Sequence, residues 1–268
     1  MKVIGFYNRK GGCGKTVSAI NVASILAKKG YKTLLLGLDP QNDLSAFFGF
    51  APNGEFYSKS NHTIVEIMND IDNEFSIKEA IYPTKYENLF IVPGNTKLER
   101  EEKALLIETL VDTRVILTRH LFEVKDTFDY VVIDMAPAGE SLININGIVA
   151  CDYVYIPIMI SENELEGLQH AITICKNLRN ANPKLKVGGT FFCRNEKWLK
   201  ASKEADEYIK QYYPELYMDS KISKNKLITD LSFIHQPLIE YDKKLKINVT
   251  NDYINLTNEI IEKCGGNK

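Results

Sequence analysis

Ten residues near the start of the chain have the composition and spacing of a phosphate-binding loop. Positions 8 to 17 read NRKGGCGKTV. Glycines let backbone N–H groups turn inward without Cβ collisions and surround phosphate oxygens at the positive end of a helix. Lys15 would reach the β- and γ-phosphates of a nucleotide, and the Thr16 hydroxyl would bind Mg²⁺. The alternative is a glycine-rich turn that contains a lysine by chance.

The segments on either side of the loop are those that the motif requires. Residues 3–7 are apolar, as in a buried strand, and residues 17–26 have the spacing of a helix. A phosphate-binding loop lies between a strand and a helix, so this context favours the motif over the chance turn.

Two acidic residues at the ends of apolar segments could complete a nucleotide site. Pro40 ends the second apolar segment and leaves Asp39 at its tip, which is the sheet edge where ligands bind in open α/β folds. Asp134 ends the apolar run 130–133 and fits the Walker B pattern, in which the acid holds the water shell of the metal. Each residue also has a simpler explanation: an Asp-Pro turn that caps a short helix, and a common strand end.

Strand-like and helix-like segments alternate along most of the chain. This order predicts an α/β fold for residues 1–268, with a single doubly wound, mostly parallel sheet flanked by helices. Most strand segments are continuous apolar runs, as in strands that are covered on both sides. We expect strands at 2–8, 33–38, 89–92, 130–135, 153–158, 187–193 and 216–222. We expect helices at 15–29, 63–69, 97–122 with a break near 109, 141–150, 162–180, 200–212 and 251–262, and a surface loop at 52–62.

Composition excludes several classes of protein. The chain has 268 residues, 44% of them hydrophobic, and neither a signal peptide nor an apolar run of the roughly 18 residues that span a bilayer, so we expect a cytoplasmic location. Five cysteines without C-x-x-C spacing indicate neither a disulfide framework nor a zinc site. The net charge of −2 excludes a generally basic nucleic-acid binder. Residues 181–268 hold 15 Lys/Arg and 12 Asp/Glu, a balance that fits a solvated surface better than a DNA-binding face.

In detail the loop resembles the deviant Walker A motif, KGGxGK[ST], of the ParA/MinD group of ATPases. The resemblance implies a P-loop NTPase with ATP and Mg²⁺ as cofactors. It also implies that Lys10 crosses a dimer interface to contact the partner's nucleotide, so that Lys10 and Lys15 both act in catalysis and ATP binding creates a homodimer. Val17 departs from the family, which usually has a second hydroxyl residue there, and we expect weaker nucleotide binding. The residues expected around the phosphates are Gly11, Gly12, Cys13, Gly14, Lys15, Thr16 and Val17.

The acidic segments extend the resemblance. The sequence LDPQ matches the second half of the family's D-x-D-P-Q, which makes Asp39 the acid that orients the attacking water, while Gly37 replaces the first Asp. The same segment looks like G-x-D-P-x-x-D of the nitrogenase iron protein, which makes Asp43 a further candidate on the metal side. Asp134 begins DMAP, similar to the D-x-P-P switch of the family. The expected metal residues are therefore Thr16, Asp39 and Asp134.

Two later segments carry the resemblance over nearly the whole chain. The segment that ends in LEGL at Leu168 matches the family's I-P…LEGL region. The segment ISKN looks like the family's I-P-R-N loop, which lies against adenine, so Lys224 and Asn225 are expected to contact the base. Without the resemblance, ISKN is an ordinary polar turn. Arg194 and Asn195, just beyond a strand, could also line the base or belong to a solvated loop.

The resemblance is strongest to the small, Soj-like partition ATPases of this group. It implies a switch that acts in plasmid or chromosome partition: an ATP-bound dimer on DNA of any sequence, at the nucleoid, with hydrolysis stimulated by a ParB-like adaptor. Because the chain begins at its first strand, no N-terminal helix-turn-helix domain is expected. Lysines of the last third could contact DNA phosphates, namely Lys197, Lys200, Lys203, Lys221, Lys243, Lys244 and Lys246.

Other functions are known for this scaffold. A MinD-like membrane switch would end in a basic amphipathic helix, whereas this chain ends in IEKCGGNK, which is too short and glycine-rich. A nitrogenase-iron-protein-like ATPase would need cluster-binding cysteines, and none follows Asp134 closely. A metabolic ligase or synthase would need a second substrate site that the sequence does not indicate. A ParA-related ATPase that positions a cargo other than DNA stays open as an alternative.

Overall fold

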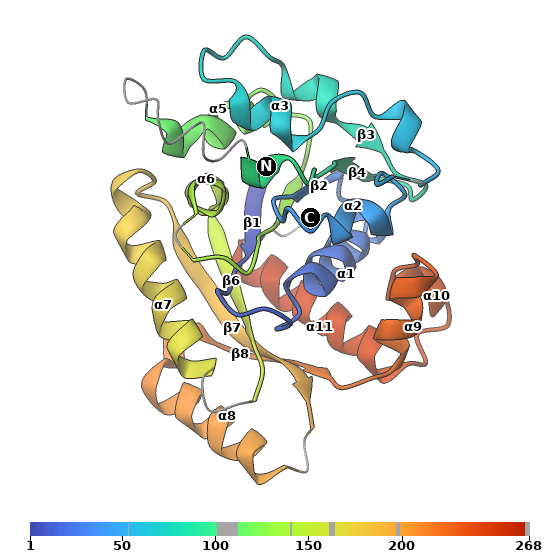
Figure 1. The fold of residues 1–268 in the computed structure, drawn as a ribbon. Coiled ribbons are helices and arrows are strands. Elements are labelled where there is room, and N and C mark those ends of the chain that lie inside the picture. Colours follow the sequence, from blue (N-terminus) through green and yellow to red (C-terminus); the bar gives the residue numbers. More distant parts are fainter. Residues whose placement is uncertain (53, 101–111, 140, 161–163, 197–198, 266–268) are drawn as a thin grey trace.

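One eight-stranded sheet forms the centre of the described structure, in the order β3-β4-β2-β5-β1-β6-β7-β8 (Figure 1). The structure is a computed structural model that describes residues 1–52, 54–100, 112–139, 141–160, 164–196 and 199–265. Neighbouring strands run parallel, except that β3 pairs antiparallel with β4 at one edge. This confirms the predicted fold class. The strands are β1 (Lys2–Phe6), β2 (Thr33–Gly37), β3 (Tyr82–Pro83), β4 (Leu89–Val92), β5 (Tyr130–Asp134), β6 (Tyr153–Ile158), β7 (Lys186–Asn195) and β8 (Tyr217–Ser223).

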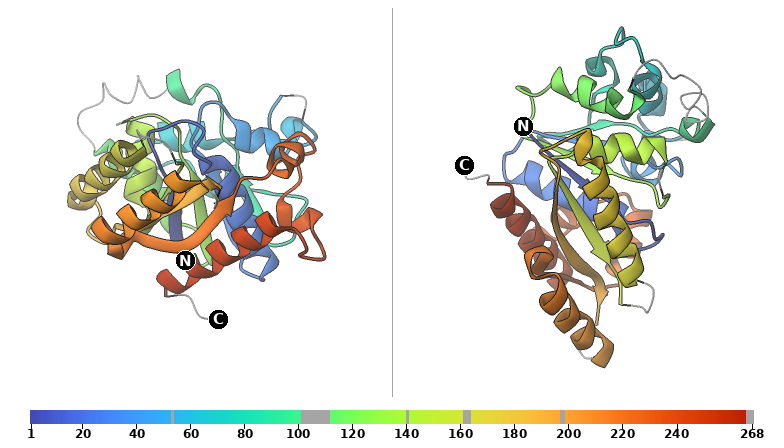
Figure 2. Two further views of the ribbon diagram at one scale, coloured as in Figure 1. Left: turned by 90° about the horizontal axis from the view of Figure 1, so that it is seen from below. Right: turned by 90° about the vertical axis from the view of Figure 1, so that its left-hand side faces the viewer.

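Helices cover both faces of the sheet, as the two further views in Figure 2 show. Two separate clusters of buried apolar residues result, one on each face. The first cluster receives α3 (Ile64–Asn69), α5 (Ile116–Phe122), α6 (Leu142–Ala150), α7 (Glu164–Asn177) and α8 (Lys200–Tyr212). The second receives α1 (Lys15–Lys28), α2 (Asp43–Phe47), α9 (Leu227–Phe233), α10 (Leu238–Tyr241) and α11 (Asn248–Lys263).

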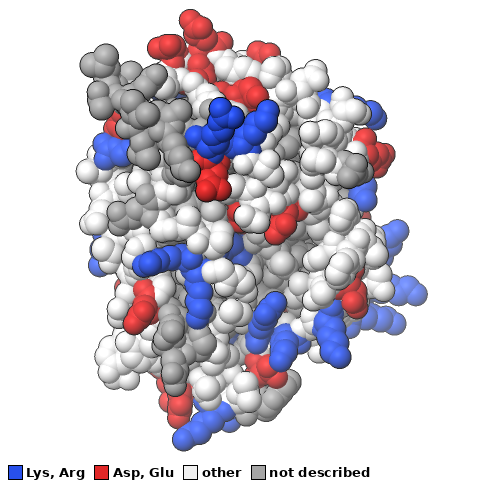
Figure 3. Space-filling view, viewed as in Figure 1, with Lys and Arg blue, Asp and Glu red and all other residues white. Residues whose placement is uncertain are grey.

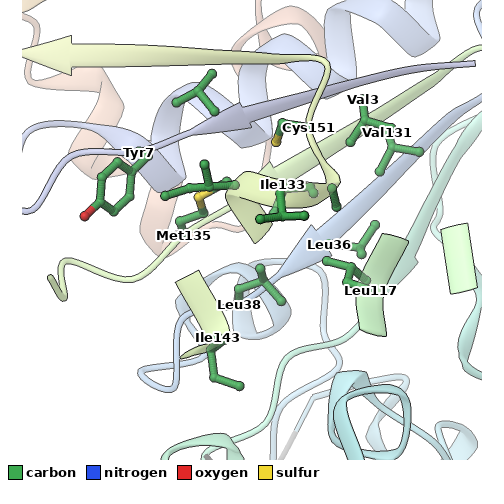
Figure 4. Packing of buried hydrophobic residues seen from close by; sticks show 14 of the residues in the cluster. Val3, Tyr7, Leu36, Leu38, Leu117, Val131, Ile133, Met135, Ile143 and Cys151 are labelled. Carbon is green, nitrogen blue, oxygen red and sulfur yellow. The ribbon is translucent and has the colours of Figure 1, made fainter. Parts of the chain in front are cut away.

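The continuous apolar strands have this pattern because both of their faces are covered. Successive side chains of a strand point to opposite faces of a sheet. In β5, Val131 and Ile133 therefore pack in the first cluster, and Tyr130 and Val132 pack in the second. Figure 4 shows Val131 and Ile133 among the side chains of the first cluster. The packing holds the carboxyl ends of β1, β2 and β5 in one line, and the predicted site residues follow these ends.

Most predicted elements are confirmed. Among the larger shifts in a boundary, the last helix begins at Asn248 rather than at 251, and α7 ends at Asn177 rather than at 180, where a 3₁₀ turn follows. Within 52–62 the structure contains a 3₁₀ turn at Tyr57–Lys59. Of the helix predicted at 97–122, α5 forms the end, and the break near Thr109 lies outside the described residues. In the described ranges, no helix has both the length and the apolar character that a membrane crossing requires.

Within the described residues, three short α-helices and one short strand were not predicted: α2, α9, α10 and β3. They contain five, seven, four and two residues. A helix of one or two turns shows too little of the 3.6-residue period to stand out from the sequence. Two of these elements, α2 and α9, border the candidate site.

Candidate nucleotide-binding site

The glycine-rich loop connects β1 to α1 with two residues in the left-handed region of backbone space. Gly12 has φ of 74°, and Gly14, which precedes the first turn of α1, has φ of 93°. Only glycine adopts these values without steric cost. A Cβ at Gly14 would also lie 3.0 Å from the Cys193 Sγ atom, because β7 packs against the loop. The glycines thus let the loop approach both the neighbouring strand and a phosphate.

A buried asparagine fixes the start of the loop. Asn8 is fully buried, and its Nδ2 donates to the Pro157 carbonyl at 2.8 Å, while its Oδ1 accepts a hydrogen bond from the Lys10 N–H at 3.0 Å. Lys15 is 5% exposed, and its Nζ donates to the Lys10 carbonyl at 2.9 Å. The loop therefore holds the Lys15 ammonium in place through its own backbone.

Asp134 lies at the end of β5, where the strand register sets it beside Phe6 of β1 and Gly37 of β2. It is fully buried, and neither carboxylate oxygen has a hydrogen-bond partner. Burial is the largest cause that raises the pKa of Asp134 to about 7, and the carboxylates of Asp39 and Asp43 act in the same direction.

Thr16 and Lys15 act on Asp134 in the opposite direction, because the hydroxyl and the ammonium both lower the pKa of its carboxyl. Buried charged groups normally have a partner or a bound metal. A carboxylate with two oxygens that lack donors, beside the Thr16 hydroxyl, fits a Mg²⁺ ion with its shell of water.

Asp39 follows β2 and lines the same cavity as Lys15 and Thr16. Its Oδ1 accepts a hydrogen bond from the Gln41 N–H at 2.9 Å, which fixes the orientation of the carboxylate. Gly37, which stands where the related motif has an acid, is tightly packed: a Cβ there would lie 3.4 Å from the Gly94 nitrogen. The structure thus brings Lys15, Thr16 and Asp39 around one cavity.

This cavity has a volume of about 320 Å³, in the range of small-ligand sites. One end holds the phosphate loop and the carboxylates, and the other end holds side chains of β7, β8, α9 and α11. The residues that line it are Gly12, Gly14, Lys15, Thr16, Val17, Asp39, Gln41, Asp43, Pro137, Cys193, Arg194, Ile222, Ile228 and Tyr253.

The predicted base contacts lie beside this cavity rather than among the residues that line it. The Lys224 Nζ pairs with the Glu196 carboxylate at 2.8 Å, and the Asn225 Oδ1 accepts a hydrogen bond from the Leu227 N–H at 2.9 Å, before α9. Their contact with a base stays a prediction. Arg194, which the sequence did suggest, lines the cavity, and its φ of 53° is unusual for a residue with a side chain.

Three residues of the apolar end were missed by sequence reasoning: Cys193, Ile228 and Tyr253. Tyr253 is 1% exposed, and its hydroxyl lies 3.4 Å from the Ser18 Oγ atom on α1. Ile228 lies on the unpredicted helix α9. No local motif marks these positions, because only the fold brings them to the phosphate loop.

Lys10 lines a different cavity from Lys15. The second cavity, of about 290 Å³, is lined by Arg9, Lys10, Glu166, Gly167 and His170. The helix α7 approaches the loop closely there, since a Cβ at Gly167 would lie 2.9 Å from the Asn8 Oδ1 atom. The loop thus presents its two lysines to two separate cavities.

Comparison with known proteins gives one family and several relatives. A family model described as an AAA domain matches residues 1–187. The chain is 29% identical over 265 residues to the chromosome-partitioning ATPase Soj of Treponema pallidum, an alignment that covers 98% of both chains.

Two solved structures show the same fold. The ATP complex of a McdA variant from Cyanothece has a TM-score of 0.83 and 22% identity, with 100% of this chain and 98% of that chain covered. The cobyrinic acid a,c-diamide synthase of Mycobacterium smegmatis, with bound ADP and magnesium, has a TM-score of 0.74 and 23% identity, with 87% and 91% covered.

Proposed function

Because this chain belongs to the ParA/MinD-type family of P-loop ATPases, we propose that it is a Mg²⁺-dependent ATPase that dimerises with ATP and acts in DNA partition. The full-length similarity to a chromosome-partitioning ATPase supports this role over others on the same fold. The fold alone would not, since the neighbours with this fold include a synthase.

The observation that carries the proposal is the separation of the two loop lysines. Lys15 serves the cavity that holds the carboxylates, whereas Lys10, five positions earlier, lines the other cavity against α7. A nucleotide bound at Lys15 of one subunit would thus have its own lysine, and Lys10, which lines the other cavity, would contact the nucleotide of a second subunit. ATP binding and dimerisation would then be linked.

The chemistry follows from the residues around the cavity. A water molecule held by Asp39 would attack the γ-phosphorus in line, the bond to the β–γ bridging oxygen would break, and ADP and phosphate would form. Lys15 and the partner's Lys10 would stabilise the charge that develops on the transferred group. Backbone N–H groups of residues 11–17 would hold the phosphates.

The Thr16 hydroxyl and Asp134 would hold Mg²⁺, with Asp39 near its water shell. The ion would neutralise charge on the β- and γ-phosphates. Ile222, Ile228 and Arg194 would form the surface for the base. Lys224 and Asn225 would reach the base after Lys224 leaves Glu196, a rearrangement that an exposed ion pair permits.

The exposed lysines near α10 are the strongest candidates for contact with DNA. Figure 3 shows Lys and Arg side chains spread over the lower part of this face, whereas Asp and Glu gather in its upper part. Lys243, Lys244 and Lys246 are exposed and lie close together in sequence between α10 and α11. Electrostatic contact of this kind would bind DNA of any sequence and would place the ATP form on the nucleoid.

Of the other predicted lysines within the described residues, two pair with acidic side chains and one is exposed. The Lys221 Nζ pairs with the Asp206 carboxylate, and Lys200 lies 3.4 Å from the Glu204 carboxylate. Lys203 is exposed on α8. Lys197 lies outside the described residues. A ParB-like adaptor would act on the DNA-bound dimer by stimulating hydrolysis.

The test of the nucleotide switch is light scattering with ATP, with ADP and without nucleotide. We expect the wild type to dimerise with ATP only, Lys10→Ala to stay monomeric while it still binds ATP, and Asp39→Ala to remain a dimer because hydrolysis fails. A Lys10→Ala protein that dimerises as the wild type does would refute the proposal.

The test of DNA binding is retention on DNA at several salt concentrations. We expect binding with ATP and not with ADP, and a triple alanine variant of Lys243, Lys244 and Lys246 should reduce the salt slope by up to about 3, or about 0.9 per lost phosphate contact. The matched control replaces three exposed lysines at the opposite end of the sheet, Lys125, Lys184 and Lys186. Equal slopes in the two variants would contradict the DNA surface, and an ATP-dependent dimer without DNA binding would indicate another cargo.

A further inference from the structure

Another large cavity, separate from those at Lys15 and Lys10, lies at the end of α2 and has no part in the proposed chemistry. Its volume is about 410 Å³, and its wall includes the rings of Phe47, Phe48, Phe56 and His235. Phe50 and Phe56 stack there with ring centroids 5.3 Å apart, and the ring of Phe47 lies 6.0 Å from that of His235. The lining residues include Ala46, Phe47, Phe48, Ala51, Phe56, Lys85 and His235.

Two exposed apolar residues come just before the lining residue His235 in the chain. Phe233 is 81% exposed and Ile234 is 57% exposed, and both directly precede His235 in the chain. His235 itself has φ of 53°, so the backbone turns sharply at the cavity wall. Exposed apolar groups beside an aromatic cavity are typical of a surface that binds a partner protein.

The charges around the cavity favour an acidic partner. Lys85 lines the cavity, and the Lys59 Nζ lies 5.5 Å from the centre of the Phe56 ring in its wall. Glu55 is the acidic residue among the described lining residues. The Glu240 carboxylate, farther along the same surface, pairs with the Lys28 ammonium at 3.1 Å.

Two helices connect this cavity to the nucleotide cavity. At the start of α2, Asp43 lines the nucleotide cavity, and at its end Phe47 lines the aromatic cavity. In the same way, Ile228 near the start of α9 lines the nucleotide cavity, and His235 just beyond its end lines the aromatic cavity. A group that binds in the aromatic cavity therefore contacts the ends of α2 and α9, whose starts border the nucleotide cavity.

We propose that the aromatic cavity is a docking site for a segment of a partner protein that inserts one large apolar side chain and sets an acidic residue against Lys85. The docked segment changes the nucleotide site through α2 and α9, and by linkage the nucleotide changes the affinity for the segment. Docking does not depend on the proposed ATPase function, whereas the coupling rests on the proposed nucleotide site.

The test starts from a library of displayed random peptides of about twelve residues, a length that spans one anchor and its flanks. The peptides are selected on the full chain and counter-selected on Ala51→Trp, which fills the cavity. We expect the selected peptides to share an aromatic or leucine residue next to Asp or Glu. A synthetic peptide of that sequence should lose roughly tenfold or more in affinity on Phe233→Ser and on Lys85→Glu. Phe122→Ser is the matched control, because Phe122 is 66% exposed on α5, on the other face of the sheet.

Several outcomes overturn the docking site. Peptides that bind Ala51→Trp as tightly as the wild type, a selection without enrichment, or equal effects of Phe233→Ser and Phe122→Ser would each do so. Flotation of the wild type, but not of Phe233→Ser, with vesicles of phosphatidylcholine and phosphatidylglycerol would assign the surface to a membrane instead.

The coupling is measured separately, as the rate at which a fluorescent ADP analogue leaves the protein. We expect saturating peptide to change this rate by about twofold or more in the wild type and not in Phe233→Ser. Peptide binding without any nucleotide binding would refute the proposed function and leave the docking site intact. An equal rate of release of the ADP analogue with and without bound peptide would refute the coupling.

Discussion

Alanine variants of Gly14, in the phosphate loop, and of Gly30, after α1, measure how much the packing of the loop against β7 contributes to the free energy of unfolding. Both have a positive φ, 93° and 88°, but a Cβ at Gly14 would lie 3.0 Å from the Cys193 Sγ atom, whereas nothing lies within 4 Å of a Cβ at Gly30. Alanine in the left-handed region costs about 1–2 kcal/mol, so Gly30→Ala should destabilise the protein by that amount. Gly14→Ala adds a contact that forces β7 or the loop to shift, at a further cost of about 1–3 kcal/mol.

The assay is urea unfolding of the single variants Gly14→Ala, Gly30→Ala and Cys193→Ala, and of the double variant Gly14→Ala with Cys193→Ala. We expect Gly14→Ala to lose about 2–5 kcal/mol, the sum of the two costs, and the double variant to recover the part caused by the contact, which the double-mutant cycle isolates. Binding of a fluorescent ADP analogue should weaken for Gly14→Ala and stay unchanged for Gly30→Ala. Equal losses of stability for the two glycine variants, or a cycle without coupling, would refute the packing of Cys193 against the loop.

Two further predictions concern Asp134 and Asn8. Burial raises the pKa of Asp134 from 3.8 to about 7. Between these two pH values the folded state binds more protons than the unfolded state. The free energy of unfolding, measured without Mg²⁺ and nucleotide, should therefore fall as the pH rises from about 4 to about 7. Asp134→Asn should remove most of this fall in urea unfolding at about pH 5 and pH 8, and equal pH dependence in both proteins would contradict the burial of a charged Asp134. Asn8→Ala leaves the Pro157 carbonyl and the Lys10 N–H without their partners and should cost about 2–4 kcal/mol in the same assay. The control Asn255→Ala, at an exposed position of α11, should cost less than about 0.5 kcal/mol, and similar losses at the two sites would argue against the role of Asn8.

The sequence could indicate which residues of the phosphate loop line the cavity because the signals of this loop are local. Gly12, Gly14, Lys15 and Thr16 lie within one loop, and the strand and helix on either side set their geometry. Asp134 was found from an apolar strand that ends in an acid, a pattern complete within a few residues. Parallel strands that end at one edge then bring such groups together without any further information.

The apolar end of the site could not be predicted in the same way. Cys193, Ile228 and Tyr253 come from three separate elements, and only the order of the strands in the sheet and the helices packed on it make them neighbours. The related motif pointed to the segment ISKN, whose first residue, Ile222, lines the cavity, while the contact of Lys224 and Asn225 with a base stays a prediction. Short helices add to the difficulty, because α9 has no periodicity that would reveal a buried face.

The same contacts explain how one short loop can serve two cavities. The Lys10 N–H is held by Asn8, and the Lys10 carbonyl accepts a hydrogen bond from Lys15, so the backbone of Lys10 is fixed on both sides. Its side chain lines the cavity against α7, where Gly167 permits the close approach of the helix to Asn8. The position of Lys10 therefore depends on α7 as much as on the loop. In the proposed ATP-bound dimer, a movement of α7 would change how Lys10 contacts the second subunit, while Lys15 would keep its place in the first cavity. Dimerisation would then be regulated without a change in the affinity of one subunit for its own nucleotide.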